Sequence, residues 1–197
     1  MNNGHCITVD VENEGLGGLT FDNGWYNLLA VNLHAKGEHT YAGHRPALEL
    51  HLVHKKYDSD ALVVVAVPFE PVAAPEKAAG GNATAANATN SSEPPPAYVK
   101  PDSSAPGYTP VLEVFHERAP PSVDNQVPVI REWDLNALVE GTYISYDGSL
   151  TAPPCSENVR WYVRQSPLSA SAEQVEVLSS ATLRMNPQGN WRTLGVK

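Results

Sequence analysis

The sequence predicts a mainly β protein, and two features of the 197-residue chain support that prediction. Short segments alternate between apolar and polar residues, as strands with one buried face do; they lie at 7–11, 27–34, 47–54, 142–150 and 157–165. The run ALVVVAVPF (61–69) is apolar on both faces and is expected to form a central, covered strand. Helical periodicity is confined to 171–185, with Ser171 as N-cap, and to a short turn at 133–139.

Composition and charge exclude several classes of protein. Apolar residues make up 42% of the chain, enough for a core, and the net charge of −9 argues against a nucleic-acid partner, because no basic surface faces phosphates. No apolar run approaches the ~20 residues of a transmembrane helix, and the N-terminus lacks the features of a signal peptide. Cys6 and Cys155 are compatible with one disulfide, with free thiols or with bridges to another chain.

A segment at about 71–125 is dominated by Ala, Pro, Asn, Ser, Thr and Gly. It offers few groups that bury area, so we expect an inserted surface loop that interrupts a single domain spanning 1–197. Its three sequons are candidate glycosylation sites if the protein enters the secretory pathway, and chance occurrence is the alternative. They are Asn82, Asn87 and Asn90.

Five of the seven histidines lie within VNLHAKGEHTYAGHRPALELHLVH (31–54). Because side chains alternate along a strand, Glu49 and His51 share one face. Asn32 and His34 likewise share a face of the preceding strand, so antiparallel pairing would bring Asn32, His34 and His51 together. A catalytic zinc needs three protein ligands and one open position, and Glu49 would then fix the tautomer of a ligand ring.

Asn32 weakens this metal-site interpretation. Zinc favours imidazole, thiolate and carboxylate ligands, and an amide oxygen is a poor donor to it. Two interpretations therefore stay open from these residues alone: His34 and His51 are ligands in an impaired metal site, or they are polar residues in a solvent-filled cavity.

Several stretches, taken together, resemble the alpha-type carbonic anhydrases. GEHTYAGHRPALELHLVH is similar to the family's Glu-His pair and the Glu-Leu-His-Leu-Val-His strand after it. DGSLTAPPCSENVRWYV is similar to the family's Gly-Ser-Leu-Thr-x-Pro-Pro stretch, and NNGHCITV, PLSASAEQV and NWR resemble further segments in family order. The resemblance implies a large twisted, mostly antiparallel sheet with short peripheral helices. Relative to the family, we expect the chain to lack an N-terminal segment and the final strand, which would leave sheet edges uncovered. Either the sequence is a fragment of a longer protein, or another protein chain covers these edges.

The resemblance also implies a metal centre. His34 and His51 fall on the second and third zinc ligands, and Glu49 on the carboxylate behind the third. Asn32 falls on the first ligand, which is histidine in active members, and Ala35 replaces the tryptophan that usually follows the second. We therefore expect zinc to be bound weakly or not at all.

The remaining catalytic residues match the family better. Thr151 matches the threonine that orients the attacking hydroxide, and Glu38 matches the glutamate that accepts the hydroxyl proton of that threonine. His5 matches the proton shuttle. The apolar wall beside the carbon dioxide position is matched by Val53, Val64, Leu150 and Val159.

The expected function is a carbonic anhydrase-like domain with an impaired zinc site, without catalysis and with a structural or interaction role. The alternative is a zinc-dependent carbonic anhydrase that reversibly hydrates carbon dioxide. The sequons and the resemblance to secreted members suggest the secretory pathway, with the protein extracellular or in an organelle lumen.

Overall fold

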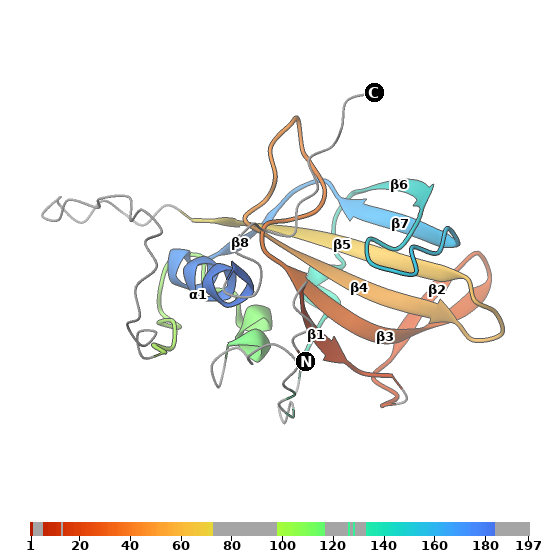
Figure 1. Ribbon diagram of the computed structural model, residues 1–197, viewed down its shortest axis with the longest axis horizontal. Coiled ribbons are helices and arrows are strands. Elements are labelled where there is room, and N and C mark those ends of the chain that lie inside the picture. Colours follow the sequence, from red (N-terminus) through yellow and green to blue (C-terminus); the bar gives the residue numbers. More distant parts are fainter. Residues whose placement is uncertain are drawn as a thin grey trace, which may run out of the picture.

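An eight-stranded sheet forms most of the described structure (Figure 1). The computed structural model describes residues 1, 6–12, 14–72, 98–116, 126, 128 and 133–183. The strands are β1 (Ile7–Asp10), β2 (Gly18–Phe21), β3 (Gly24–His34), β4 (Leu48–Lys56), β5 (Leu62–Pro71), β6 (Tyr143–Gly148), β7 (Val159–Arg164) and β8 (Leu168–Ala170). The helical elements are the 3-10 turns η1 (Pro110–Phe115) and η2 (Asn136–Leu138) and the helix α1 (Ala172–Leu183). This confirms the predicted mainly β fold.

The strand order is β1-β3-β4-β5-β7-β6, with β2 paired to β3 and β8 paired to β5. All pairs are antiparallel except those of β5 with β7 and with β8, which are parallel, so the sheet is mixed but mostly antiparallel, as expected. β5 lies between β4 and β7 and is buried on both faces over most of its length, which confirms the central position predicted for ALVVVAVPF.

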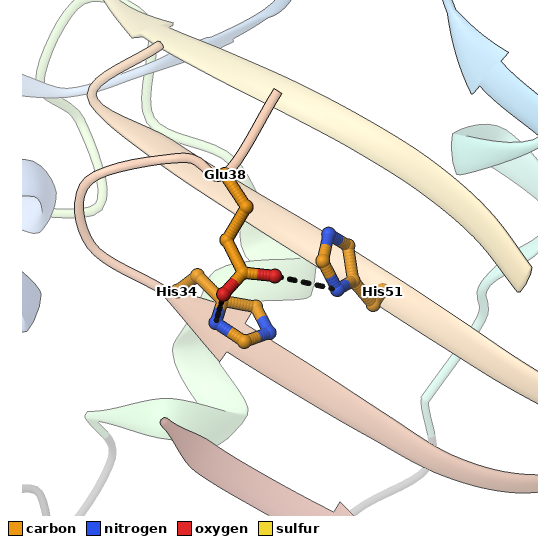
Figure 2. Close-up of side chains that lie close together, drawn as sticks. All are labelled: His34, Glu38 and His51. Carbon is orange, nitrogen blue, oxygen red and sulfur yellow. Dashed lines mark ion pairs between the residues drawn. The ribbon is translucent and has the colours of Figure 1, made fainter. Parts of the chain in front are cut away.

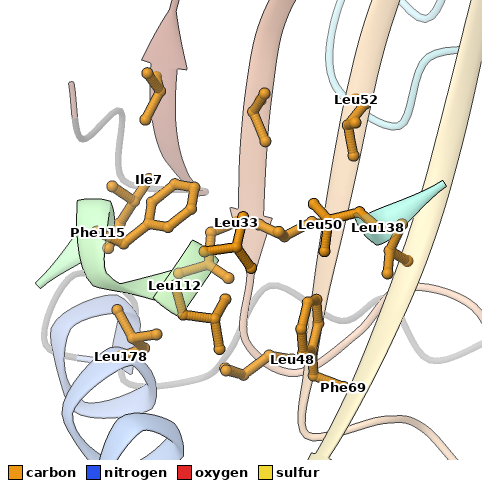
Figure 3. Close-up of a cluster of buried hydrophobic side chains, with 14 of the residues drawn as sticks. Ile7, Leu33, Leu48, Leu50, Leu52, Phe69, Leu112, Phe115, Leu138 and Leu178 are labelled. Atoms are coloured by element: carbon orange, nitrogen blue, oxygen red, sulfur yellow. The ribbon is translucent and has the colours of Figure 1, made fainter. Parts of the chain in front are cut away.

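Alternation along the strands separates two apolar clusters, one on each face of the sheet. The first cluster lies between the sheet, η1 and α1, and Figure 3 shows its side chains meeting there. Its members include Leu33, Leu48, Leu50, Phe69, Leu112, Phe115 and Leu178. The second cluster lies on the opposite face and is built around Val64, Ala66, Val159, Trp161 and Val163. The polar residues of β3 and β4 discussed below share that second face.

The predicted extent of the inserted loop, about 71–125, is corrected by the structure. β5 continues to Pro71, and η1 inserts Leu112 and Phe115 into the first cluster, where both are almost fully buried. Burying such a side chain stabilises the fold by roughly 1.5–3 kcal/mol. The prediction was wrong there because the average composition of the segment hides the short apolar stretch PVLEVF, which packs on residues distant in the sequence. The sequons Asn82, Asn87 and Asn90 lie outside the described residues.

Helix α1 begins where the sequence predicted, after the N-cap Ser171. The Ser171 hydroxyl oxygen accepts a hydrogen bond from the Gln174 backbone N–H at 3.1 Å, and Gln174 Oε1 accepts one from the Ser171 N–H at 3.2 Å. This reciprocal pair is a capping box.

The strands β2 and β8 were not predicted, because four and three residues are too few for a periodic pattern to stand out. No helix among the described residues has the length and apolar character to cross a membrane.

Candidate metal centre

The antiparallel register of β3 and β4 brings the predicted residues together. Asn32 is paired with His51, and His34 with Glu49, so all four side chains lie on the face of the second cluster. The imidazole centroids of His34 and His51 are 4.4 Å apart. The two rings therefore lie close together on neighbouring antiparallel strands, as expected, and the common cavity that they were expected to face stays a prediction.

Glu49 connects two imidazoles below the surface of the site. Its Oε1 lies 2.6 Å from His51 Nε2 and 2.6 Å from His39 Nδ1, and its Oε2 accepts a hydrogen bond from the His39 backbone N–H at 3.1 Å. A carboxylate only accepts hydrogen bonds, so both ring nitrogens that face it are protonated. His51 Nδ1 is therefore left with a free lone pair on the side of His34, which is the geometry predicted for a carboxylate behind a ligand ring.

His39 and Tyr146 extend this network and were missed by the sequence analysis as site residues. Because His39 donates through Nδ1, its Nε2 accepts a hydrogen bond from the Tyr146 hydroxyl at 2.8 Å. Trp161 packs edge-on against His39 and His51, with ring centroids 5.1 and 4.9 Å away. The Glu-His pair at 38–39 was the available signal for His39, whereas Tyr146 lies on β6, and only the tertiary fold brings it near.

Glu38 approaches both predicted metal ligands. Its Oε1 lies 3.6 Å from His34 Nδ1 and its Oε2 lies 3.8 Å from His51 Nδ1, as Figure 2 shows. These separations are longer than hydrogen bonds. Glu38 Oε2 and His34 Nε2 are both buried and have no hydrogen-bond partner among the described residues.

The turn between β3 and β4 sets the position of Glu38. The Gly37 N–H donates to Pro46 O at 2.9 Å, and Arg45 Nη1 donates to the backbone oxygens of Gly37 and Glu38 at 3.1 and 2.8 Å. A Cβ at position 37 would lie 2.4 Å from Pro46 Cγ and 2.8 Å from Glu49 Oε2. Glycine is therefore required there for the turn to pass so close to the buried carboxylate.

The electrostatic environment keeps the site in a metal-binding protonation state. Burial lowers the pKa of His34 to about 4, and the nearby His51 ring acts in the same direction, so His34 is a neutral imidazole at neutral pH. Burial alone would raise the pKa of Glu49, but the hydrogen bonds from His39 and His51 outweigh it and hold that pKa well below its usual range.

The four predicted wall residues gather in one place. Val64 and Val159 belong to the second cluster, and Val53 and Leu150 pack against it. This apolar surface includes Trp161, which also contacts His51. The expected apolar wall beside the histidines is therefore present, and its role toward a substrate stays a prediction.

One other predicted residue, Thr151, is not brought into the site. Thr151 is exposed and makes no hydrogen bond to Glu38 within the described part of the chain, which corrects the expected Thr151–Glu38 contact. The physical reason is that the Glu38 carboxylate lies between two imidazoles instead. His5 lies outside the described residues.

Cys6 is buried, with its Sγ 3.4 Å from Thr8 Oγ1, and Cys155 is exposed.

The side chains fit a cation with a mixed set of donors better than one with three imidazoles. His34, Glu38 and His51 each offer one ligand atom, and these atoms lie within 4.8 Å of one another. Position 32 contributes only an amide. The ligand atoms of a second group, His39, Glu49 and His51, also lie within 4.8 Å of one another. The two short contacts in that group, however, are hydrogen bonds of 2.6 Å that both imidazoles donate to Glu49 Oε1.

A mixed β-sheet with imidazoles and a carboxylate gathered on one face is an arrangement that could hold a metal ion, and comparison with known proteins narrows the class of protein. A family model of eukaryotic-type carbonic anhydrases matches residues 97–194. A carbonic anhydrase of Pectobacterium carotovorum is 31% identical over 188 residues, covering 94% of this chain and 62% of that protein. One from Klebsiella pneumoniae is 31% identical, covering 92% of this chain and 60% of its own length.

Solved structures with a similar fold point to the same family as these sequence relatives. The alpha-carbonic anhydrase of Thermovibrio ammonificans, in complex with the inhibitor sulfanilamide, superimposes with a TM-score of 0.72 at 26% identity, covering 100% of this chain and 70% of that one. Dioscorin complexed with ascorbate has a TM-score of 0.64 at 25% identity, covering 98% and 68%. The family model and the homologues support the assignment of this chain to the alpha-type, or eukaryotic-type, carbonic anhydrase family. The chain spans about 62% of the length of the first of these curated relatives.

Proposed function

We propose that this chain is a carbonic anhydrase-like domain with an impaired zinc site, which hydrates carbon dioxide poorly and has a structural or interaction role. The observation that supports the proposal is Asn32. It is paired with His51 on the neighbouring strand and puts an amide where the family pattern has an imidazole. An amide oxygen is a poor zinc donor, so zinc is held less tightly than by three histidines.

The other residues of the site do not replace what is missing for catalysis. A zinc ion bound here would supply a Lewis acid that makes a water molecule acidic. Glu49 keeps His51 in the tautomer that presents Nδ1, and Val64 and Val159 belong to the buried apolar cluster next to it. Within the described residues, however, Thr151 makes no hydrogen bond to Glu38, so the contact expected to orient the attacking group is missing.

An interaction role is supported by the edge of the sheet. Within the described residues β6 is an edge strand, and its Ile144 and Tyr146 are 55% and 40% exposed. An unpaired strand edge with apolar side chains is a template for another polypeptide. This favours a protein partner that covers β6.

The alternative function is that of a zinc-dependent carbonic anhydrase. The names of the relatives favour it, as do the Glu49–His51 hydrogen bond and the apolar wall. It requires an adequate third donor to the metal.

Replacing Asn32 with histidine tests the proposal. Asn32→His places a third imidazole directly across from His51, and we expect zinc affinity to rise by about tenfold or more. Measurable hydration of carbon dioxide should accompany it if Ala35 leaves the ring properly packed. Zinc content and hydratase rate are measured after brief dialysis against a mild chelator.

The matched control is Asn27→His, which adds an imidazole to the same strand away from the site, where Asn27 pairs with Lys55. Its zinc affinity and hydratase rate should equal those of the unmodified protein. Stoichiometric zinc with rapid turnover in the unmodified protein would instead establish the alternative function.

A further inference from the structure

We propose that Glu38 takes the place of the missing imidazole, so that His34, Glu38 and His51 together hold a divalent metal ion of the zinc class. This inference rests on the proposed function in one respect, since both concern a centre that has an amide at position 32. It goes further by assigning Glu38 as a metal ligand, and it raises the metal affinity expected of the impaired site.

The distances between the donor atoms support this set. Ligand atoms bound to zinc at about 2.0–2.1 Å in a tetrahedron lie about 3.3 Å from one another. Glu38 Oε1 lies 3.6 Å from His34 Nδ1 and Glu38 Oε2 lies 3.8 Å from His51 Nδ1, and one ligand atom from each of the three residues lies within 4.8 Å of the other two. Rotation of these side chains toward a common cation closes the set, whereas the same distances are too long for hydrogen bonds.

The lack of another partner for one Glu38 oxygen is a second, independent observation. Among the described residues Glu38 Oε2 is buried without a hydrogen-bond partner. The Arg45 guanidinium donates to the backbone oxygen of Glu38 at 2.8 Å. A buried carboxylate oxygen without a donor is costly unless a cation meets it.

The protonation of His51 also suits the metal. Because Nε2–H donates to the Glu49 carboxylate, Nδ1 presents its lone pair toward Glu38 and His34. Two histidines and one glutamate are a donor set that holds zinc in other proteins, with a fourth position left open.

If Glu38 binds the metal, the site combines metal affinity with slow catalysis. Within the described residues Thr151 makes no hydrogen bond to Glu38, so the centre holds a metal and yet lacks the contact that orients a reacting group. The site is thus expected to bind metal more tightly than His34, His51 and an amide would, while hydration of carbon dioxide stays slow.

The test is titration of the metal-free protein with Co²⁺, followed by its visible absorption, and displacement of the Co²⁺ by Zn²⁺. In Glu38→Gln the affinity should fall by about tenfold or more, because even residues behind a ligand cost 10–100-fold when changed. Asn32→Ala should bind like the unmodified protein. Glu70→Gln is the matched control, since Glu70 pairs with the exposed His44 elsewhere on the sheet.

Three outcomes would overturn the proposal: no Co²⁺ binding by the unmodified protein, weakening by Asn32→Ala, or unchanged binding by Glu38→Gln. If Glu38→Gln does not fold, Glu38→Asp retains the charge and should shift the Co²⁺ spectrum, and an unaltered spectrum would also refute the assignment. Hydratase rates of the same samples keep the two proposals distinct. Rapid turnover contradicts the proposed function, whereas only the metal titrations decide the role of Glu38.

Discussion

Glu49 lies on β4 with its side chain fully buried, and it accepts hydrogen bonds from two imidazoles and one backbone N–H. It is the residue that determines which nitrogen of His51 is available. A buried carboxylate with several donors is favourable only while those donors remain.

Glu49→Gln keeps the shape of the side chain but introduces an N–H donor at a place where the neighbouring groups are themselves donors. We expect the free energy of unfolding to fall by about 1–3 kcal/mol. Metal affinity should fall about 10–100-fold, because a neutral amide oxygen holds the His51 Nε2–H tautomer less strongly than a carboxylate does. Urea unfolding and Co²⁺ titration measure the two effects. Glu70→Gln, at a largely exposed pair, should cost at most about 0.5 kcal/mol, and indistinguishable unfolding curves for the two variants would refute the argument.

The sequence predicts some of these residues better than others. His34 and His51 could be placed on one face because alternation along two strands depends only on local sequence. Glu38 could not be placed, since its carboxylate is positioned by contacts of Gly37 and Arg45 across a turn. Its approach to the imidazoles is a property of tertiary structure.

Among the elements, α1 and η1 are joined through Gln174. Its Oε1 accepts hydrogen bonds from the Thr109 and Ser171 backbone N–H groups, at 3.0 and 3.2 Å, and its Nε2 donates to Thr109 O at 3.0 Å. Gln174 is fully buried. One amide therefore caps the helix and also fixes the segment that enters η1.

Gln174→Ala should lower the free energy of unfolding by about 1–3 kcal/mol, because it leaves buried backbone groups without partners. Thermal or urea unfolding measures the loss. Glu176→Ala, at an exposed position of the same helix, controls for helix propensity and should stay within about 0.5 kcal/mol of the unmodified protein. Equal losses in both variants would show that the link to Thr109 contributes nothing.

The elements also differ in how far the sequence predicts them. The long strands β3 and β4 were recognised because eight residues repeat the same alternation, and β5 because it is a continuous apolar run. η1 was assigned to a loop because its apolar residues are few, and their burial depends on Leu178 of α1 and on the sheet. Such packing between distant segments leaves no periodic signal in the sequence.

For the whole molecule, buried histidines make stability depend on pH. Burial lowers the pKa of His54 to about 4, although its Nδ1–H donates to Leu52 O at 3.0 Å and its hydrogen bonds to the backbone oppose the shift. An unfolded histidine has a pKa of about 6.5. The unfolded chain therefore binds the proton first as the pH falls, and the stability present above pH ~6.5 is lost progressively toward pH ~4.

We expect the metal-free protein to be less stable at pH 5 than at pH 7, with His54 accounting for on the order of 2 kcal/mol. Urea unfolding at the two pH values measures the difference. His54→Gln removes the titrating ring and should show a smaller pH dependence, whatever its stability at pH 7. The same difference in both proteins would exclude His54 as its source.

β5 and β7 are neighbours in the sheet although Val159, the partner of Leu62, follows it by 97 residues. Closing such a long connection has an entropic cost that grows only slowly with length, by about 0.6 kcal/mol for each doubling. The speed of folding is more sensitive, because pairing between distant segments is slow. The length of chain between these two strands therefore bears on how fast the sheet is completed much more than on how stable it is once complete.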